Sequence, residues 1–240
     1  VVGELKEEAT VDLESHLKLA NTGVPFVTVK FAVSLDGKIA TRSGASQWIT
    51  NAKSRERAHM MRLENDAVMV GINTVMKDDP RLTARGDASV EFGRQPVRII
   101  VDSDFRTPAN SSMFQEQGQI IIAGASNTEG SSFPDNVNKY SFPGEEGKVD
   151  LEWMLQQIGK EPISSILVEG GGELIGSLFD LGLVDKVTAF IAPVVIGGID
   201  SHSAVKGGGA IDMSMVHRLK NVKMQCFETD VMISGYCDRG

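Results

Sequence analysis

One junction in the second half of the chain constrains its fold most. A short apolar run, Ile163 to Val168, ends at the acidic residue Glu169, and three glycines follow at positions 170–172. A stretch with apolar residues at helical spacing begins at Leu174. This order predicts a buried strand, a tight turn and the start of a helix.

The glycine turn is a candidate site for an anion. Such a turn leaves backbone N–H groups at the positive end of a helix dipole, where phosphate groups bind. The expected ligand is the diphosphate of a dinucleotide. The three consecutive glycines do not follow the spaced Gly-x-Gly-x-x-Gly pattern of a Rossmann unit, and plain turn geometry is the simpler alternative.

Strands and helices alternate along most of the rest of the chain. Apolar and polar patterning predicts helices over residues 10–20, 52–64 and 151–158, with Asn51 as the N-cap of the second. It predicts strands over residues 26–33, 67–70, 97–101, 120–123, 139–142, 187–191, 222–227 and 231–236. This order predicts an α/β fold with a mixed, mostly parallel sheet flanked by helices and an antiparallel C-terminal edge.

Composition excludes several classes of protein. The 240 residues suffice for one large or two small domains, and 41% hydrophobic with 23% charged content is typical of a globular protein. The net charge of −8 argues against nucleic-acid binding. No apolar run reaches about 18 residues, the length that a membrane-spanning helix needs. Five arginines could hold an anion locally, although solvated faces are the simpler interpretation: Arg55, Arg57, Arg62, Arg81 and Arg85.

Cysteine and histidine content indicates a protein without a disulfide framework or a metal. The two cysteines, Cys226 and Cys237, favour a reducing cytoplasm. The four histidines show no metal-ligand spacing, so we expect no metal. The N-terminus has neither a signal peptide nor an initiating Met, and we expect processing or excision from a longer chain.

Several blocks of sequence together resemble one known family. Their order and spacing are similar to the reductase domain of the bacterial bifunctional riboflavin-biosynthesis deaminase–reductases (RibD), from Pro25 to Tyr236. Residues 1–24 resemble the connector that follows the deaminase domain in that family. The blocks are Val27 to Lys30, Ser34 to Ala40, Gln47 to Thr50, Val70 to Val75, Asp78 to Thr83, Val168 to Gly172 and Ala192 to Gly198.

The resemblance implies a dihydrofolate-reductase-like fold and a specific reaction. It implies a connector over residues 1–24, a reductase domain over 25–240, and a homodimer supported by the run from Val194 to Gly198. NADPH would reduce C1′ of 5-amino-6-(5-phosphoribosylamino)uracil to give the ribitylamino product. The chain lacks the zinc ligands of the deaminase half, so it would be a stand-alone reductase or one fused to a deaminase in a longer protein.

Two residues are candidates for catalysis. Lys30 interrupts an apolar strand. It could polarise C1′ or relay a proton, or it could instead snorkel to water from a sheet edge. Glu169 lies at the carboxyl end of the central strand, where ligands bind in open α/β sheets. By resemblance it contacts the pyrimidine, and a carboxylate that complements the helix dipole is the alternative. Asp36 could pair with Lys30, but its Asp-Gly context favours a turn.

The resemblance also implies binding positions for the substrate and the cofactor. Arginine suits a phosphate because of its planar fork of donors. Ser103 could receive the 2′-phosphate of NADPH, but Asp102 and Asp104 flank it, so NADPH rather than NADH rests on the resemblance. The substrate positions are Ser46, Thr50, Arg62, Leu82, Arg85 and Glu169. The cofactor positions are Ala32, Trp48, Thr74, Asp78, Ser103, Gly171, Gly172, Glu173, Leu174, Ile175, Gly176 and Ser177.

Two alternatives to this function stay open. Archaeal and fungal relatives reduce the pyrimidine before deamination, the 2,5-diamino compound, and this chain could do the same. A catalytically inactive binding domain of the same fold is the second alternative. Retention of Lys30, Arg62, Arg85 and Glu169 speaks against an inactive domain.

Overall fold

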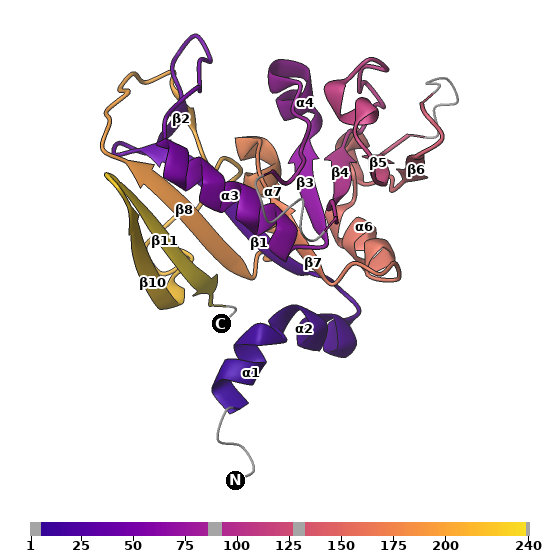
Figure 1. Ribbon diagram of the computed structural model, residues 1–240, viewed down its shortest axis with the longest axis horizontal. Coiled ribbons are helices and arrows are strands. Elements are labelled where there is room, and N and C mark those ends of the chain that lie inside the picture. Colours follow the sequence, from indigo (N-terminus) through magenta and orange to yellow (C-terminus); the bar gives the residue numbers. More distant parts are fainter. Residues whose placement is uncertain (1–5, 86–92, 127–132, 239–240) are drawn as a thin grey trace.

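One large sheet forms the centre of the computed structural model, which describes residues 6–85, 93–126 and 133–238. Within these residues, neighbouring strands pair in the order β10 (Leu219–Phe227), β11 (Asp230–Cys237), β8 (Lys186–Ala192), β1 (Phe26–Ser34), β7 (Ser165–Val168), β3 (Ala67–Gly71), β4 (Val97–Val101), β5 (Ile120–Gly124) and β6 (Val137–Ser141) (Figure 1).

The sheet is mostly parallel, as the sequence predicts. All pairs from β8 to β6 in this order are parallel, whereas the hairpin of β10 and β11 runs antiparallel along one edge. The carboxyl ends of the parallel strands therefore meet at the upper end of the sheet in Figure 1. Such an end is where α/β sheets bind ligands.

Helices cover both faces of this sheet. α3 (Ala52–Glu64) and α4 (Ile72–Asp78) pack on one face, and α6 (Leu151–Ile158) and α7 (Gly172–Asp180) pack on the other. Because successive side chains of a strand point to opposite faces, Val68 and Val70 join the α3 core while Ala67 and Met69 join the α7 core. The continuous apolar runs of the sequence reflect burial on both faces.

The predicted N-cap of α3 is confirmed. The side chain of Asn51 accepts a hydrogen bond from the Ser54 amide at 3.0 Å. Its Nδ2 donates to Phe227 O at 2.6 Å, and Asp230 accepts from the Asn51 amide at 2.8 Å. The turn between β10 and β11 therefore fixes where α3 begins.

The N-terminal helix is two helices instead of the one predicted over residues 10–20. α1 (Lys6–Asp12) and α2 (Glu14–Thr22) are separated at Leu13, whose φ of −104° and ψ of 9° lie outside the helical region. Polar contacts rather than an apolar stripe hold α2 below the sheet (Figure 1): Lys18 Nζ donates to Pro25 O at 2.9 Å, and Lys186 pairs with Glu14 at 2.9 Å.

Three further segments differ from the sequence prediction. The stretch after Gly71 is the helix α4, and the strand predicted over 139–142 starts two residues earlier, as β6. A two-stranded sheet joins β2 (Lys38–Ala40) to β9 (His202–Ser203), at positions where no strand is predicted. Two short 3-10 helices, η1 (Ser112–Gln115) and η2 (Glu145–Gly147), lie in the connections.

Candidate active site

A buried ion pair joins the end of β7 to the last turn of α3. Arg62 donates through Nε to Oε1 of Glu169 at 2.6 Å and through Nη2 to Oε2 at 2.9 Å. Its Nη1 donates to the carbonyl oxygen of Thr83 at 2.8 Å. The Glu169 side chain is only 6% exposed and that of Arg62 only 15%. Both predicted substrate residues therefore belong to one fixed group.

The sheet register brings Lys30 to the same place. Val168 pairs with Val29 on β1 and with Met69 on β3, so Glu169, one residue later, lies at the centre of the carboxyl end of the sheet. Lys30 follows Val29 and therefore faces the same side of the sheet as Glu169. β1 lies between β8 and β7, so the alternative of a lysine on a sheet edge is wrong.

Burial dominates the electrostatics of these three side chains. Burial lowers the pKa of Lys30, the Glu169 carboxylate opposes this shift, and Arg62 adds to it. Burial alone would raise the pKa of Glu169, but Arg62 and then Lys30 outweigh it, so this pKa is lowered. Burial would lower the pKa of Arg62, which Glu169 instead raises. The site therefore holds an ionised carboxylate beside a lysine that loses its proton more readily than usual.

Lys30 has no polar partner in the described part of the chain. No hydrogen bond or ion pair joins its Nζ to residues 6–85, 93–126 or 133–238, and Nζ lies 5.5 Å from the ring centroid of Phe190. The face of an aromatic ring attracts a cation but does not accept its three hydrogen bonds. The ammonium group is therefore available to a ligand.

The glycine turn lies beside α4. Gly170 and Gly171 have φ angles of 154° and 78°, and a Cβ on Gly170 would lie 3.2 Å from Oγ1 of Thr74. α7 starts at Gly172 without a side-chain cap. Its first amides have no partner within the helix, because an α-helix leaves its first four N–H groups unpaired. This geometry suits the anionic oxygens of a diphosphate.

The predicted diphosphate segment divides into two parts. Gly171 through Leu174 make up the turn and the first helical residues, whereas the Ile175 amide already donates to Gly171 O at 3.0 Å. A Cβ on Gly176 would lie 2.3 Å from the backbone of Lys206, and one on Gly172 would lie 2.7 Å from Ser203 O. Gly172 and Gly176 therefore allow residues 203–207 to pack closely on α7.

The other predicted cofactor residues lie along the same end of the sheet. Ala32 is on β1 two residues after Lys30, and Ser103 follows β4. Asp78 ends α4 and is exposed. Trp48 is 69% exposed, so it is not part of the core, and its ring centroid lies 4.4 Å from Cζ of Arg55.

The remaining predicted substrate residues lie on two loops. Ser46 and Thr50 precede α3, and Thr50 is buried, with its carbonyl oxygen accepting from Arg55 at 2.5 Å. Leu82 is buried with a φ of 56°, and Arg85 is exposed with its Nε 3.4 Å from Thr83 Oγ1. Arg85 is therefore the better placed of the two predicted arginines to meet a ligand from solvent.

The rest of the arginine cluster is mostly paired. Arg57 binds Glu64 at 2.9 Å, and Arg81 pairs with Glu116 at 3.1 Å.

Asp36 accepts from Ser34 Oγ at 2.6 Å and from the Gly197 amide at 2.7 Å, so it holds a turn, as expected from its Asp-Gly context.

Sequence interpretation missed three residues near the site. The Thr83 carbonyl oxygen binds Arg62, Lys206 packs over Gly172, and His59 lies on α3 one turn before Arg62. Only His59 carried a signal in the sequence, through its spacing of three residues from Arg62 on one helix face.

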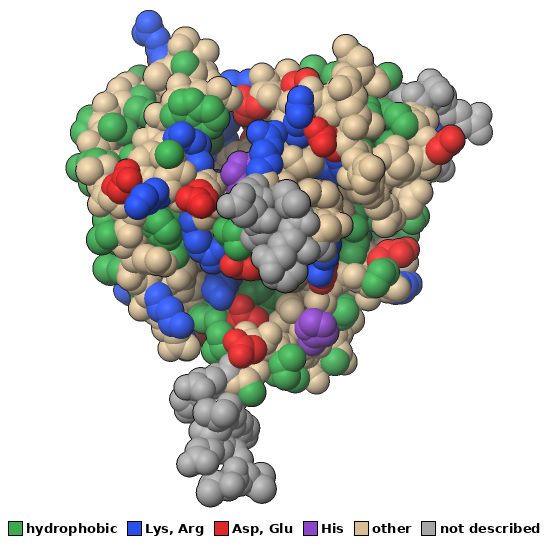
Figure 2. Space-filling model, in the orientation of Figure 1, with side chains coloured by type: hydrophobic (Ala, Val, Ile, Leu, Met, Phe, Trp, Pro, Cys, Tyr) green, Lys and Arg blue, Asp and Glu red, His purple; other side chains and the backbone are tan. Residues whose placement is uncertain are grey.

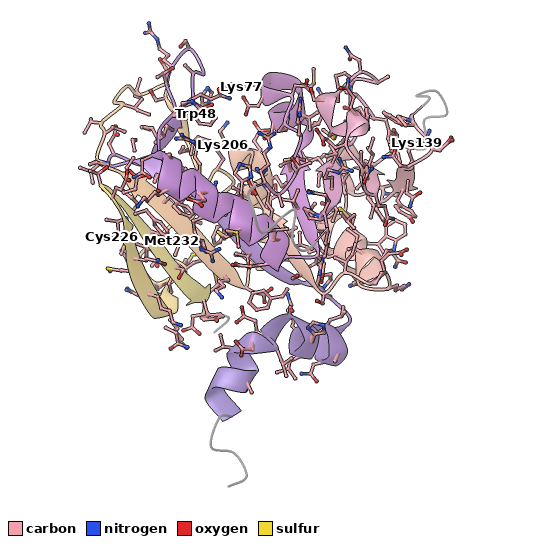
Figure 3. The ribbon with its side chains drawn as sticks, in the orientation of Figure 1. Trp48, Lys77, Lys139, Lys206, Cys226 and Met232 are labelled. Atoms are coloured by element: carbon pink, nitrogen blue, oxygen red, sulfur yellow. The ribbon has the colours of Figure 1, made fainter. Side chains whose placement is uncertain are left out.

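Figure 2 shows Lys and Arg side chains gathered around a hollow beside α3. In Figure 3, Trp48, Lys77 and Lys206 lie in the upper part of the molecule, whereas Lys139 lies near β6 and Cys226 near the β10 edge.

Among the described residues, no group of three His, Cys, Asp or Glu side chains could hold a metal ion. No helix in that part of the chain is long and apolar enough to cross a membrane.

Comparison with known protein families gives one match that spans most of the chain. Residues 25–233 match the family described as RibD C-terminal domain. The riboflavin biosynthesis protein RibD of Actinobacillus pleuropneumoniae is 34% identical over 238 residues, which are 97% of this chain and 62% of that protein. A 2,5-diamino-6-ribosylamino-4(3H)-pyrimidinone 5′-phosphate reductase of Methanothermobacter thermautotrophicus is 37% identical over 215 residues, 87% of this chain and 96% of that protein.

A solved structure agrees over almost the whole chain. The diaminohydroxyphosphoribosylaminopyrimidine deaminase/5-amino-6-(5-phosphoribosylamino)uracil reductase of Thermotoga maritima superposes with a TM-score of 0.85 at 30% identity. The match covers 98% of this chain and 63% of that one. The chain thus spans less than two thirds of the length of the RibD proteins that it matches.

Proposed function

Because this chain belongs to the family of RibD C-terminal domains, we propose that it is a pyrimidine reductase of riboflavin biosynthesis. The proposed reaction is the NADPH-dependent reduction of 5-amino-6-(5-phosphoribosylamino)uracil to its ribitylamino product. One observation carries the proposal: the half-buried Lys30 and the largely buried Arg62 and Glu169 lie together at the carboxyl end of the sheet, close to the glycine turn of α7.

Glu169 is proposed to hold the pyrimidine. Its carboxylate is ionised and fixed by Arg62, and each carboxylate oxygen can accept a further hydrogen bond. An aminopyrimidine presents N–H donors from its ring and its exocyclic amino groups. A buried carboxylate therefore matches this edge and orients the ring by charge-assisted bonds.

Lys30 is proposed to act on the sugar. Opening the ribose ring leaves a C1′=N bond and puts a proton on the former ring oxygen. The hydride then adds to C1′, and the nitrogen takes up one proton. An ammonium group whose pKa is lowered by burial both stabilises the developing negative charge and releases its proton readily.

The residues at the glycine turn fit a nicotinamide dinucleotide, which would supply the hydride. The uncapped start of α7 and Thr74 would hold the diphosphate, and Ser103 would hold the 2′-phosphate. Asp102, which could favour NADH by binding the ribose hydroxyl, is instead fully buried, and its Oδ2 accepts from the Thr107 amide and hydroxyl at 2.7 Å each. This supports NADPH as the cofactor.

The substrate has two candidates, because the relatives differ. The Thermotoga maritima protein is named as a reductase of the deaminated uracil, and the Methanothermobacter thermautotrophicus protein as a reductase of the 2,5-diamino pyrimidinone. We propose the uracil as the main substrate, since residues 1–24 resemble the connector after a bacterial deaminase domain. The diamino compound is the second candidate.

Purified protein tests both candidates directly. Each pyrimidine is added with NADPH, and the loss of absorbance of the reduced cofactor gives kcat/KM for the two substrates. We expect turnover of both, with a larger kcat/KM for the uracil. A larger value for the diamino compound would reverse the substrate assignment, and no turnover of either would refute the proposed function.

The organisation of the protein is proposed on the same basis. Residues 1–24 act as a connector and residues 25–240 as the reductase domain, which in a longer protein can be fused to a deaminase, in the cytoplasm. We also propose a homodimer, since exposed apolar residues lie in the loop after β8 (Val194, Val195 and Ile199) and on the edge strand β10 (Val222 and Met224). Sedimentation that shows only monomer at micromolar concentration would exclude the dimer.

A further inference from the structure

His59 carries an unused hydrogen-bonding atom inside the candidate site. Its Nδ1 is buried and has no hydrogen-bond partner among the described residues. The residue lies on α3 three positions before Arg62, so the two side chains share one side of the helix. Buried polar atoms without a partner are rare in folded proteins, and each one asks for an explanation.

The backbone of Thr83 lies beside the imidazole and acts to raise its pKa, and the carbonyl oxygen of Thr83 accepts from Nη1 of Arg62 at 2.8 Å. The loop that carries Thr83 is held in place by the buried Leu82, whose φ is 56°. A neutral imidazole that carries its proton on Nε2 keeps a lone pair on Nδ1, which can then accept a hydrogen bond.

Charges around His59 keep the imidazole neutral. Burial lowers its pKa first, and the nearby Arg62 and Arg85 lower it further, while the Thr83 backbone and the Glu169 carboxylate act in the opposite direction. The pKa of His59 therefore lies below its ordinary value, and the ring is uncharged at neutral pH.

We propose that His59 is a further substrate-positioning residue, whose Nδ1 lone pair accepts a hydrogen bond from an N–H group of the pyrimidine. The inference rests on the proposed function. An ionised phosphate has no proton to donate, whereas the pyrimidine presents several N–H groups that can donate to this lone pair. Together with the Glu169 carboxylate, Nδ1 makes two acceptors in one cluster, which suits a ligand rich in N–H donors.

Two substitutions separate the two ring nitrogens. In His59→Gln the amide reaches the place of Nε2, so the Nδ1 acceptor is lost. In His59→Asn the amide oxygen takes the place of Nδ1, so an acceptor remains there. We expect His59→Gln to raise the KM for the pyrimidine about tenfold and to leave the KM for NADPH within about twofold. His59→Asn should recover most of the pyrimidine affinity.

The pH profile gives a second readout that a purely structural role would not change. In the wild type, kcat/KM for the pyrimidine should fall on the acid side as His59 gains a proton, because a protonated Nδ1 cannot accept a hydrogen bond. This acid limb should be absent in His59→Gln. His16→Gln, the same change at an exposed histidine of α2, should leave both readouts as in the wild type.

The outcomes distinguish this inference from the proposed function. If the wild type turns over a pyrimidine and His59→Gln keeps its KM and its pH profile, the role of His59 is refuted and the function stands. If His59→Gln raises the KM for the pyrimidine and the KM for NADPH equally, and His59→Asn recovers neither, the role of His59 is also refuted. If the wild type neither binds nor reduces either pyrimidine, the function and this inference fall together.

Discussion

Arg62 holds Glu169 through both carboxylate oxygens, at 2.6 and 2.9 Å, and so links the last turn of α3 to the end of β7. Its third bond, to Thr83 O at 2.8 Å, leaves two of the five guanidinium N–H donors for a ligand. Arg62 can therefore still contact the substrate, while its position depends on Glu169. The pair is the centre of the proposed site.

Removal of the Glu169 carboxylate should affect both activity and stability. Glu169→Ala leaves the Arg62 guanidinium buried without its counter-charge, which typically costs about 3–5 kcal/mol of unfolding free energy. We expect kcat/KM for the pyrimidine to fall at least about 100-fold, as for loss of an oriented charged contact in an active site. Urea unfolding and steady-state kinetics measure the two effects.

The matched control is an Arg–Glu pair that lies entirely on α3. Arg57 binds Glu64 with bonds of 2.9 and 3.0 Å, but the Glu64 side chain is 51% exposed. Glu64→Ala should therefore cost less than about 1 kcal/mol and leave turnover unchanged. Unchanged turnover in Glu169→Ala would show that Glu169 does not hold the pyrimidine.

Lys30→Met should lower activity without lowering stability, unlike Glu169→Ala. The change removes a half-buried ammonium group that has no hydrogen bond or ion pair among the described residues, and burial lowers the pKa of Lys30 by more than Glu169 raises it. We expect kcat to fall about 100- to 10,000-fold, the range for loss of a proton donor, with no loss of unfolding free energy. Lys53→Met, at an exposed position of α3, should change neither.

Lys30 also predicts the alkaline limit of activity. Because burial lowers its pKa, the ammonium form should disappear at a lower pH than for a free lysine. As the pH rises, the kcat of the wild type should therefore begin to decline at a pH below the ordinary lysine pKa of about 10.4. A flat rate across that range, or full activity of Lys30→Met, would contradict the assigned role.

Gly176→Ala tests the packing of residues 203–207 on α7. The new Cβ would lie 2.3 Å from the backbone carbonyl group of Lys206 and 2.7 Å from the Gly207 nitrogen, so the backbone must shift. Overpacking of this kind typically costs about 1–3 kcal/mol. Gly208→Ala is the matched control, since its Cβ would meet only Asp180 at 3.8 Å. Equal melting temperatures for the two variants would show that the segment does not pack on Gly176.

Asp36 gives a pH-dependent prediction. Hydrogen bonds from Ser34 and then from the Ile196 and Gly197 amides lower its pKa to about 2, against about 3.9 in an unfolded chain. These bonds should therefore persist above about pH 4 and weaken as the pH falls towards 2.

Amide exchange of Ile196 and Gly197 reports on this turn. At pH 5 both amides should exchange faster in Asp36→Asn than in the wild type, and the difference should shrink as the pH falls towards 2. Asp200→Asn, an exposed position in the same loop, serves as the control. Equal exchange rates at pH 5 would mean that Asp36 does not hold this segment.

Local patterns in the sequence predict most of the fold. Continuous apolar runs predict the central parallel strands because both faces are buried, and Asn51 predicts the start of α3 because its side chain caps the first turn. The break at Leu13 is not visible in the pattern, since ion pairs such as Glu14 with Lys186 decide how α2 packs.

The site is less accessible to sequence reasoning. Lys30, Arg62 and Glu169 are far apart in the chain, and only the pairing of β1 with β7 and the packing of α3 bring them together. The closeness of Gly176 to Lys206 depends on a loop path that no local signal determines. The resemblance to a family supplied these positions, and the register of the sheet explains why the three side chains meet.

Transfer of deuterium tests the central claim most directly. The protein is given 5-amino-6-(5-phosphoribosylamino)uracil and NADPH that carries deuterium at both C4 positions, and the product is examined by mass spectrometry and NMR. The account predicts one deuterium at C1′ of a ribitylamino product, with almost none formed by Glu169→Ala. Oxidation of NADPH without deuterium at C1′, or no ribitylamino product, would contradict it.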